Sequence, residues 1–144
     1  MSSDLKRLYS EIIKEHASAP FHFEKISNSP IQLKAYNPIC GDRFDFYISN
    51  QLTSIHFHGF GCAISKASSS IMVKLLEGKK NNEALELCKQ FLRFVNKESL
   101  ANEVVLPDEL LAFSGVHDFP ERMDCATLAW KEMEKYLSNS VPEK

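Results

Sequence analysis

The sequence lacks a long apolar run, a marked excess of one charge and a large number of cysteines. The longest stretch without Asp, Glu, Lys or Arg runs from Phe46 to Ser65, and its serines, amides and two histidines make it a poor membrane span. The 17 basic and 19 acidic side chains give a formal net charge of −2. This balance excludes the dense cationic field that binding to nucleic acid or to an anionic membrane surface requires.

Cysteine is scarce, with 4 residues among 144. That number is too small for a disulfide scaffold but sufficient for one metal site. The first residues, Met-Ser-Ser-Asp-Leu-Lys-Arg, show no apolar segment of the kind found in secretory signals, so we expect a cytoplasmic protein with reduced thiols. The length predicts a single domain over residues 1–144. Such a domain buries roughly 70% of its unfolded surface and needs neither disulfides nor metal merely to fold.

Hydrophobic periodicity predicts an α+β fold. Helical spacing predicts a first helix over residues 4–17, and alternation predicts short strands near residues 31–35, 44–48 and 55–57. Helical spacing returns after residue 61. It predicts a helix ending near residue 78, a second capped by Asn82, a short one over 107–115 and a last one from about Pro120. The order indicates a small antiparallel three-stranded sheet packed against several helices.

Three cysteines and one aspartate occupy positions that favour ionised side chains. Cys40 lies in Asn-Pro-Ile-Cys-Gly-Asp (37–42), where the proline and glycine permit a turn that directs Cys40 and Asp42 toward the same point. Cys62 begins a predicted helix, and a helix N-terminus favours a thiolate. Cys125 lies three residues after the cationic Arg122. Three thiolates and a carboxylate are a tetrahedral ligand set that suits zinc.

The spacing of these residues matches no general zinc-finger pattern. It therefore leaves open the alternative that the cysteines are separate buried thiols, since free cysteine is often a small core residue. We expect this of Cys88, which lies on an apolar helical stripe. A Cys–His hydrolase is a remote alternative, because no motif ties a histidine to a cysteine.

Other polar residues receive structural interpretations. His56 and His58 alternate with apolar residues and are expected on the solvated face of a strand. His16 is expected to be half-buried and hydrogen-bonded, Trp130 is expected in the core, and no role is assigned to His117. The serines at 65 and 68–70 are interpreted as small residues that let a helix pack closely on the sheet.

Three segments resemble the SufU family, whose members are zinc-binding sulfur-transfer proteins within the IscU/NifU-like iron–sulfur cluster assembly superfamily. They are Asn-Pro-Ile-Cys-Gly-Asp-Arg (37–43), Gly-Phe-Gly-Cys-Ala-Ile-Ser-Lys-Ala-Ser-Ser-Ser (59–70) and Phe-Pro-Glu-Arg-Met-Asp-Cys-Ala-Thr-Leu-Ala-Trp (119–130). The resemblance covers almost the whole chain. It implies the IscU-like fold, with residues of about 79–110 corresponding to a helical insertion typical of SufU.

The resemblance also implies roles for individual residues. Cys40, Asp42, Cys62 and Cys125 would be the metal ligands, with zinc as the cofactor. Cys40 and Arg122 would be catalytic residues of a sulfurtransferase, Cys40 accepting persulfide sulfur. The implied partner is a SufS-like, pyridoxal-phosphate-dependent cysteine desulfurase, with an iron–sulfur scaffold as a further partner downstream.

The same resemblance carries an alternative, a scaffold that binds iron or a [2Fe-2S] cluster at these ligands. IscU scaffolds place a histidine immediately before the last cysteine, whereas Asp124 occupies that position here. This difference and the insertion favour sulfur transfer. A purely structural zinc module is disfavoured by Asp42, because structural sites use cysteine and histidine. Asp124 and the Phe-His-Phe segment (21–23) depart from the SufU pattern, and they affect the expected partner more than the metal site.

Overall fold

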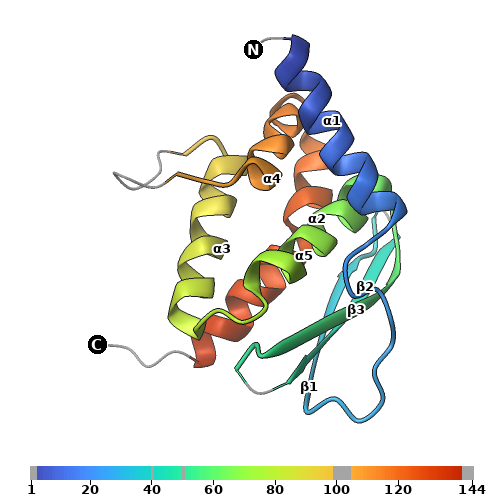
Figure 1. The fold of residues 1–144 in the computed structure, drawn as a ribbon, viewed down its shortest axis with the longest axis vertical. Coiled ribbons are helices and arrows are strands. Elements are labelled where there is room, and N and C mark those ends of the chain that lie inside the picture. The colour runs from blue at the N-terminus through green and yellow to red at the C-terminus, as the bar shows by residue number, and fades with distance from the viewer. Residues whose placement is uncertain (1–2, 40, 50, 99–104, 141–144) are drawn as a thin grey trace.

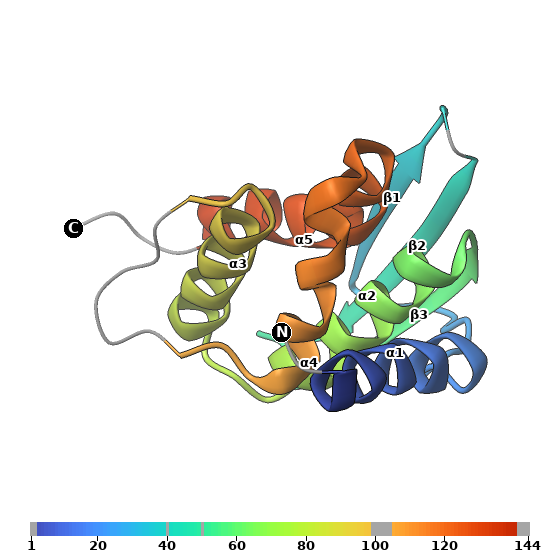
Figure 2. The ribbon, with the colours of Figure 1, turned by 90° about the horizontal axis from the view of Figure 1, so that it is seen from above.

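A three-stranded sheet with helices on one of its faces forms the described part of the chain, residues 3–39, 41–49, 51–98 and 105–140 of a computed structural model (Figures 1 and 2). These elements confirm the α+β class. In chain order they are α1 (Ser3–Ser18), β1 (Ile31–Asn37), β2 (Asp42–Ser49), β3 (Ser54–Phe60), α2 (Ala63–Leu76), α3 (Asn81–Val95), α4 (Asp108–Leu111), the 3-10 helix η1 (Ala112–Asp118) and α5 (Pro120–Ser140).

The sheet is an antiparallel meander in the order β1-β2-β3. Because side chains alternate along a strand, Phe44, Phe46 and Ile48 all point to the same face, and all three are fully buried. The predicted alternation is confirmed on this inner face. It is weaker on the outer face, where Tyr47 is only 8% exposed.

Helices α2 and α5 lie between the sheet and the remaining helices, with α3 packed on α5 and α1 packed on α2 (Figures 1 and 2). The predicted core residues Trp130 and Cys88 are fully buried, as is Phe91, whose ring centroid lies 4.7 Å from that of Trp130. Burial raises the pKa of the Cys88 thiol. Cys88 is therefore a core residue, as its helical stripe predicts.

Two buried serines of α2, Ser68 and Ser70, form hydrogen bonds to neighbouring helices. Ser68 donates to the Ala126 carbonyl of α5 at 2.5 Å and accepts from Trp130 Nε1 at 3.0 Å. Ser70 Oγ lies 2.7 Å from His16 Nδ1 of α1. For these two residues, close packing on the sheet was the wrong interpretation, because their hydroxyls satisfy polar groups on α5 and α1. The expectation that His16 is half-buried and hydrogen-bonded is confirmed.

The segment after α1 covers part of the outer sheet face. The His22 ring stacks on His56 with centroids 4.7 Å apart, and Phe23 lies 4.7 Å from His58. His56 and His58 are consequently half-buried, so the prediction that they lie on a solvated strand face was wrong. Nδ1 of His22 lies 3.0 Å from Glu77 Oε2 and 3.1 Å from the Ile55 carbonyl, which ties the segment to β3 and to the end of α2.

Two predicted helix boundaries were wrong. Asn82 is not a cap, because α3 already begins at Asn81 and the Glu83 carboxylate accepts from the Lys80 amide at 3.3 Å. The short helix does not end at Gly115, since it continues as η1 to Asp118. Among the described helices, none is both long and apolar enough to cross a membrane.

Candidate metal centre

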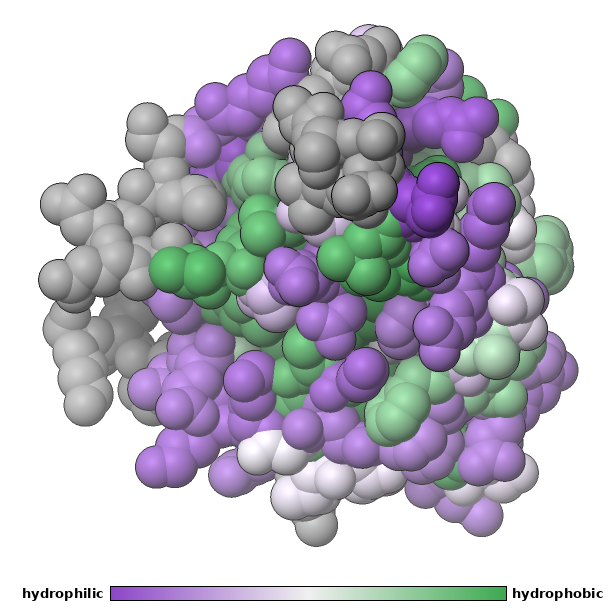
Figure 3. All heavy atoms as spheres, turned by 45° about the horizontal axis from the view of Figure 1, so that its top comes forward, coloured by the Kyte–Doolittle hydropathy of each residue, from purple (hydrophilic) through white to green (hydrophobic). Residues whose placement is uncertain are grey.

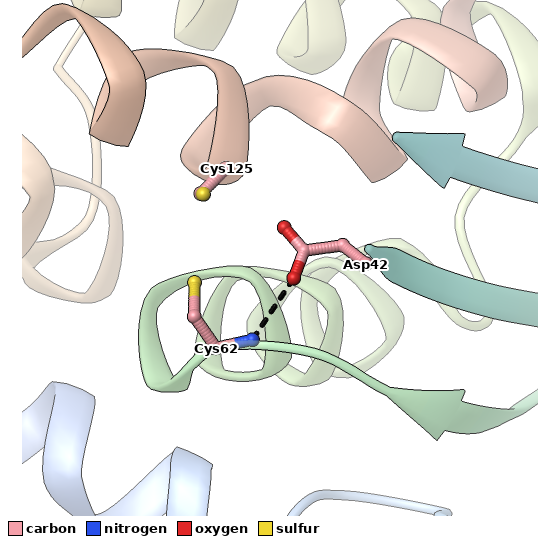
Figure 4. A group of neighbouring side chains, drawn as sticks. All are labelled: Asp42, Cys62 and Cys125. Atoms are coloured by element: carbon pink, nitrogen blue, oxygen red, sulfur yellow. Dashed lines mark hydrogen bonds between the residues drawn. The ribbon is translucent and has the colours of Figure 1, made fainter. Parts of the chain in front are cut away.

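Three segments that are distant in the sequence bring Asp42, Cys62 and Cys125 together. Asp42 begins β2, Cys62 precedes α2, and Cys125 lies in the second turn of α5 (Figure 4). One carboxylate oxygen and the two sulfur atoms all lie within 4.8 Å of one another. The three side chains point into a common space, which agrees with the ligand set that the family resemblance implies. Their role as metal ligands stays a prediction.

The tight connection between β1 and β2 sets the position of Asp42. Gly41 has φ +79°, a conformation that residues with a Cβ rarely adopt, and its amide donates to the Asn37 carbonyl at 2.7 Å. The turn that the sequence predicts from this glycine is confirmed. Asp42 follows it directly and is only 1% exposed. Cys40 lies in this connection but outside the described residues.

Cys62 is the N-cap residue of α2. Its backbone amide donates to Asp42 Oδ1 at 2.9 Å, and its sulfur accepts from the Ser65 amide at 3.4 Å. The sulfur therefore caps the N-terminus of α2 by accepting from one of its first amides. Cys62 is exposed, in contrast to Cys125, which is 7% exposed.

The buried thiol of Cys125 lies beside two acidic groups. Burial raises the pKa of this thiol, and the neighbouring Cys62 and Asp42 side chains raise it further. In the protein alone this thiol therefore holds its proton. A cation bound between the three groups would reverse that preference, because it stabilises the thiolate directly.

The second carboxylate oxygen of Asp42 shows whether these side chains could hold a metal ion. Among the described residues this oxygen, Oδ2, is buried and has no hydrogen-bond partner. A buried polar group without a hydrogen bond is costly, so this oxygen is available to a ligand. Two sulfur donors and one oxygen donor suit Zn²⁺ or iron, and the residues present fit such an ion.

A cleft of about 590 Å³ opens onto the three donors. Its lining includes Arg122, the predicted catalytic residue, and Glu121, which sequence reasoning missed and for which the sequence carries no signal. Among the residues that the structure describes, the lining is Gly41, Asp42, Phe60, Gly61, Cys62, Glu121, Arg122 and Cys125. The donors can thus be reached by a reactant from outside.

Gly61 is a second residue that sequence reasoning missed. A Cβ at this position would lie 2.6 Å from Asp42 Oδ1, 2.7 Å from Ser65 Oγ and 2.9 Å from Phe44 Cε2. Only glycine lets the backbone pass this close to the carboxylate. The Gly-Phe-Gly segment signals a tight approach of the chain, but not which residue lies on the other side.

The sequence model of the family described as NifU-like N terminal domain matches residues 8–140. The chain belongs to this family. A member from Streptococcus pyogenes serotype M1, named iron-sulfur cluster assembly scaffold protein IscU, is 36% identical over 144 residues that include 96% of this chain and 88% of that protein. Another, the zinc-dependent sulfurtransferase SufU of Bacillus subtilis strain 168, is 34% identical over 137 residues, 93% of this chain and 92% of that protein.

The fold of this NifU-like chain also matches a solved structure. That structure is described as an iron-sulfur cluster assembly scaffold protein for the SUF system from Fervidobacterium islandicum AW-1. It superposes with a TM-score of 0.80 at 30% identity, covering 94% of this chain and 99% of the other. The resemblance to SufU and to the IscU/NifU-like superfamily is confirmed, and so is a place in iron–sulfur cluster assembly.

The position where IscU scaffolds carry a histidine is held by Asp124 on α5. Asp124 is exposed and is not among the described residues that line the cleft. His117 lies in η1, and its side chain lies outside the described part of the structure. Within the described residues, the group that could hold a metal ion consists of Asp42, Cys62 and Cys125.

Proposed function

We propose that the chain is a zinc-dependent sulfurtransferase that receives persulfide sulfur from a cysteine desulfurase on Cys40. The observation that carries the proposal is the convergence of Asp42, Cys62 and Cys125, with a buried carboxylate oxygen that has no hydrogen-bond partner in the described part of the chain. Cys40, two residues before Asp42, is proposed as the fourth ligand. The similarity to a protein named zinc-dependent sulfurtransferase over nearly the whole chain supports this choice of metal and activity.

The proposed reaction is an exchange between sulfur atoms. The Cys40 thiolate attacks the outer sulfur of a persulfide on the desulfurase, and a new sulfur–sulfur bond forms as the old one breaks. The desulfurase cysteine leaves as a thiolate, so no external oxidant or reductant is required. Bound zinc supplies positive charge that keeps its cysteine ligands deprotonated at neutral pH.

Arg122 contributes a positive charge to the wall of the cleft. A persulfide that enters the cleft is an anion, and the guanidinium attracts anions through charge-assisted hydrogen bonds. The side chain is exposed, so it can contact the incoming group before the group reaches the sulfur donors. We assign Arg122 to guiding and orienting the persulfide.

The direct test combines metal analysis with a desulfurase assay. The purified chain should hold one zinc ion per molecule and accelerate sulfide release from cysteine by a cognate desulfurase. Cys40→Ala should abolish the acceleration, while Cys88→Ala, which removes a core thiol far from the cleft, should retain it. Undiminished acceleration by Cys40→Ala would refute the acceptor assignment.

A scaffold for a [2Fe-2S] cluster is the second candidate, favoured by the relative named as an IscU scaffold at 36% identity. The same donors would then hold iron. Anaerobic purification separates the two, because a colourless protein with stoichiometric zinc supports sulfur transfer and a brown protein with bound iron supports the scaffold. The exposed Asp124 in place of a histidine favours the first outcome.

A further inference from the structure

The outer face of the sheet carries an aromatic and cationic row at the end nearest the metal centre. Tyr36, Arg43 and Phe60 lie side by side on β1, β2 and β3 because they are paired in the strand register. The Arg43 guanidinium lies over the Tyr36 ring, 4.5 Å from its centroid. This cation–π contact holds the guanidinium in place but leaves its N–H donors at its edge available.

A small cavity of about 240 Å³ lies against this row, and its other lining residues include Lys25, Asp45 and His58. The Tyr36 hydroxyl donates to Asp45 Oδ1 at 3.1 Å, so the aspartate already has a partner. Within the described part of the chain, neither Arg43 nor Lys25 forms an ion pair. Two cations against one carboxylate leave the cavity with an uncompensated positive charge.

Phe60 joins the cavity to the metal centre. It is 64% exposed and lines both the small cavity and the metal cleft. Two further exposed apolar residues, Ile39 and Phe119, belong to the segments that supply the other ligands. On the face shown in Figure 3, hydrophobic residues gather in patches within a largely hydrophilic surface. A protein that approaches the metal cleft over the β3 side contacts Phe60 and comes close to Arg43.

We propose that the cavity beside Arg43 binds an acidic side chain of the desulfurase that delivers sulfur to the cleft. This inference rests on the proposed function, because it takes the sulfur donor to be a protein. A carboxylate there meets a guanidinium that the Tyr36 ring already orients, so little side-chain entropy is lost on docking. Phe60 then excludes water from the ion pair and strengthens it.

The test measures binding and turnover separately. Calorimetry of the zinc-loaded chain with its cognate desulfurase gives the dissociation constant, and the sulfide assay gives the half-saturating concentration and the maximal rate. Arg43→Gln removes the charge and keeps the length of the side chain. It should weaken both binding and half-saturation about tenfold, a loss of about 1.4 kcal/mol, with an unchanged maximal rate and zinc content. Lys25→Gln should act in the same direction.

Lys34→Gln is the matched control. Lys34 lies on the same sheet face and is also exposed. It pairs with Asp45, two residue pairs along the register from the Tyr36–Arg43 pair, and it is not among the residues that line the cavity. It should bind the desulfurase like the wild type. Added NaCl should weaken the wild type and the control more than Arg43→Gln. Equal affinities for all three proteins, or equal losses for Arg43→Gln and Lys34→Gln, would overturn the docking site.

The wild-type chain separates this inference from the proposed function. If it binds the desulfurase through Arg43 but does not accelerate sulfide release, sulfur transfer is refuted and the docking site stands. If it accelerates release and the Arg43 variant is unaffected, the docking site is refuted and sulfur transfer stands. If it does neither, both are overturned.

Discussion

Replacing Gly61 with alanine should weaken metal binding although no proposed ligand is replaced. The new Cβ would lie 2.6 Å from Asp42 Oδ1, whereas carbon and oxygen in close contact lie about 3.3 Å apart, so the carboxylate must retreat by about 0.7 Å. That shift is several times the tolerance of about 0.2 Å for metal–ligand distances. It also stretches the 2.9 Å hydrogen bond from the Cys62 amide to the same oxygen.

The expected losses of zinc affinity and of folding stability follow from the displaced carboxylate and the stretched hydrogen bond. Misplacing groups that orient a metal ligand typically weakens metal binding about 10–100-fold, and overpacking a tight site costs about 1–3 kcal/mol of folding stability. Competition with a chromophoric chelator measures the zinc affinity, and thermal unfolding of the zinc-loaded protein measures stability. Both should fall in Gly61→Ala.

Gly115→Ala is the matched control, because a Cβ at residue 115 meets no atom within 4 Å and its backbone is not in the left-handed region. It should keep wild-type zinc affinity. If Gly61→Ala binds zinc as tightly as Gly115→Ala, the close packing of residue 61 against Asp42 has no role in metal binding and the reasoning fails.

Three further predictions test the architecture around the site. Removing zinc with a chelator should lower the melting temperature by roughly 10 °C, because the ion joins three distant segments. Binding stabilises the folded state by about 4 kcal/mol when the free zinc concentration is about 1,000 times the dissociation constant. An unchanged melting temperature after complete removal would contradict this. Burial, and secondarily Lys74, lower the pKa of His16 below its unfolded value of 6.5, so the folded protein loses stability as the pH falls below 6.5, until the folded-state pKa has been passed. Urea unfolding at about pH 7.5 and pH 5.5 should show a larger loss for the wild type than for His16→Gln; equal losses would rule out this role. Ser68→Ala should cost about 1–3 kcal/mol in the same assay, because it leaves the buried Trp130 N–H without its acceptor, and a neutral result would mean that water or another group replaces the hydroxyl.

Local patterns predicted most of the fold. The apolar alternation on β2 and the helical stripes of α1 and α2 depend on neighbouring residues, so they can be read directly from the sequence. Boundaries were less accurate where a tertiary or capping contact decides them. At α3, for example, the Glu83 carboxylate stabilises the first turn and the helix begins before Asn82.

The candidate site was predicted only in part by pattern. The sequence predicts that Cys40 and Asp42 share one turn, and Cys40 lies outside the described residues. The spacing to Cys62 and Cys125 gave no geometric link, and family resemblance supplied it. The sequence did not predict the role of Gly61 or the contact of Ser65 with the Cys62 sulfur, and the reason is physical. Their importance arises from contacts with Asp42 and with the Cys62 sulfur, which exist only after β2 and the start of α2 have been brought together.

The central claim is that the chain carries sulfur on Cys40 next to a zinc ion held by Asp42, Cys62 and Cys125. Mass spectrometry of the zinc-loaded chain after reaction with a cognate desulfurase and cysteine tests it most directly. The account predicts one added sulfur atom on the peptide that contains Cys40, and none on any peptide of Cys40→Ser. Added sulfur on another cysteine, or a wild-type chain that remains unmodified while the desulfurase turns over, would contradict the account.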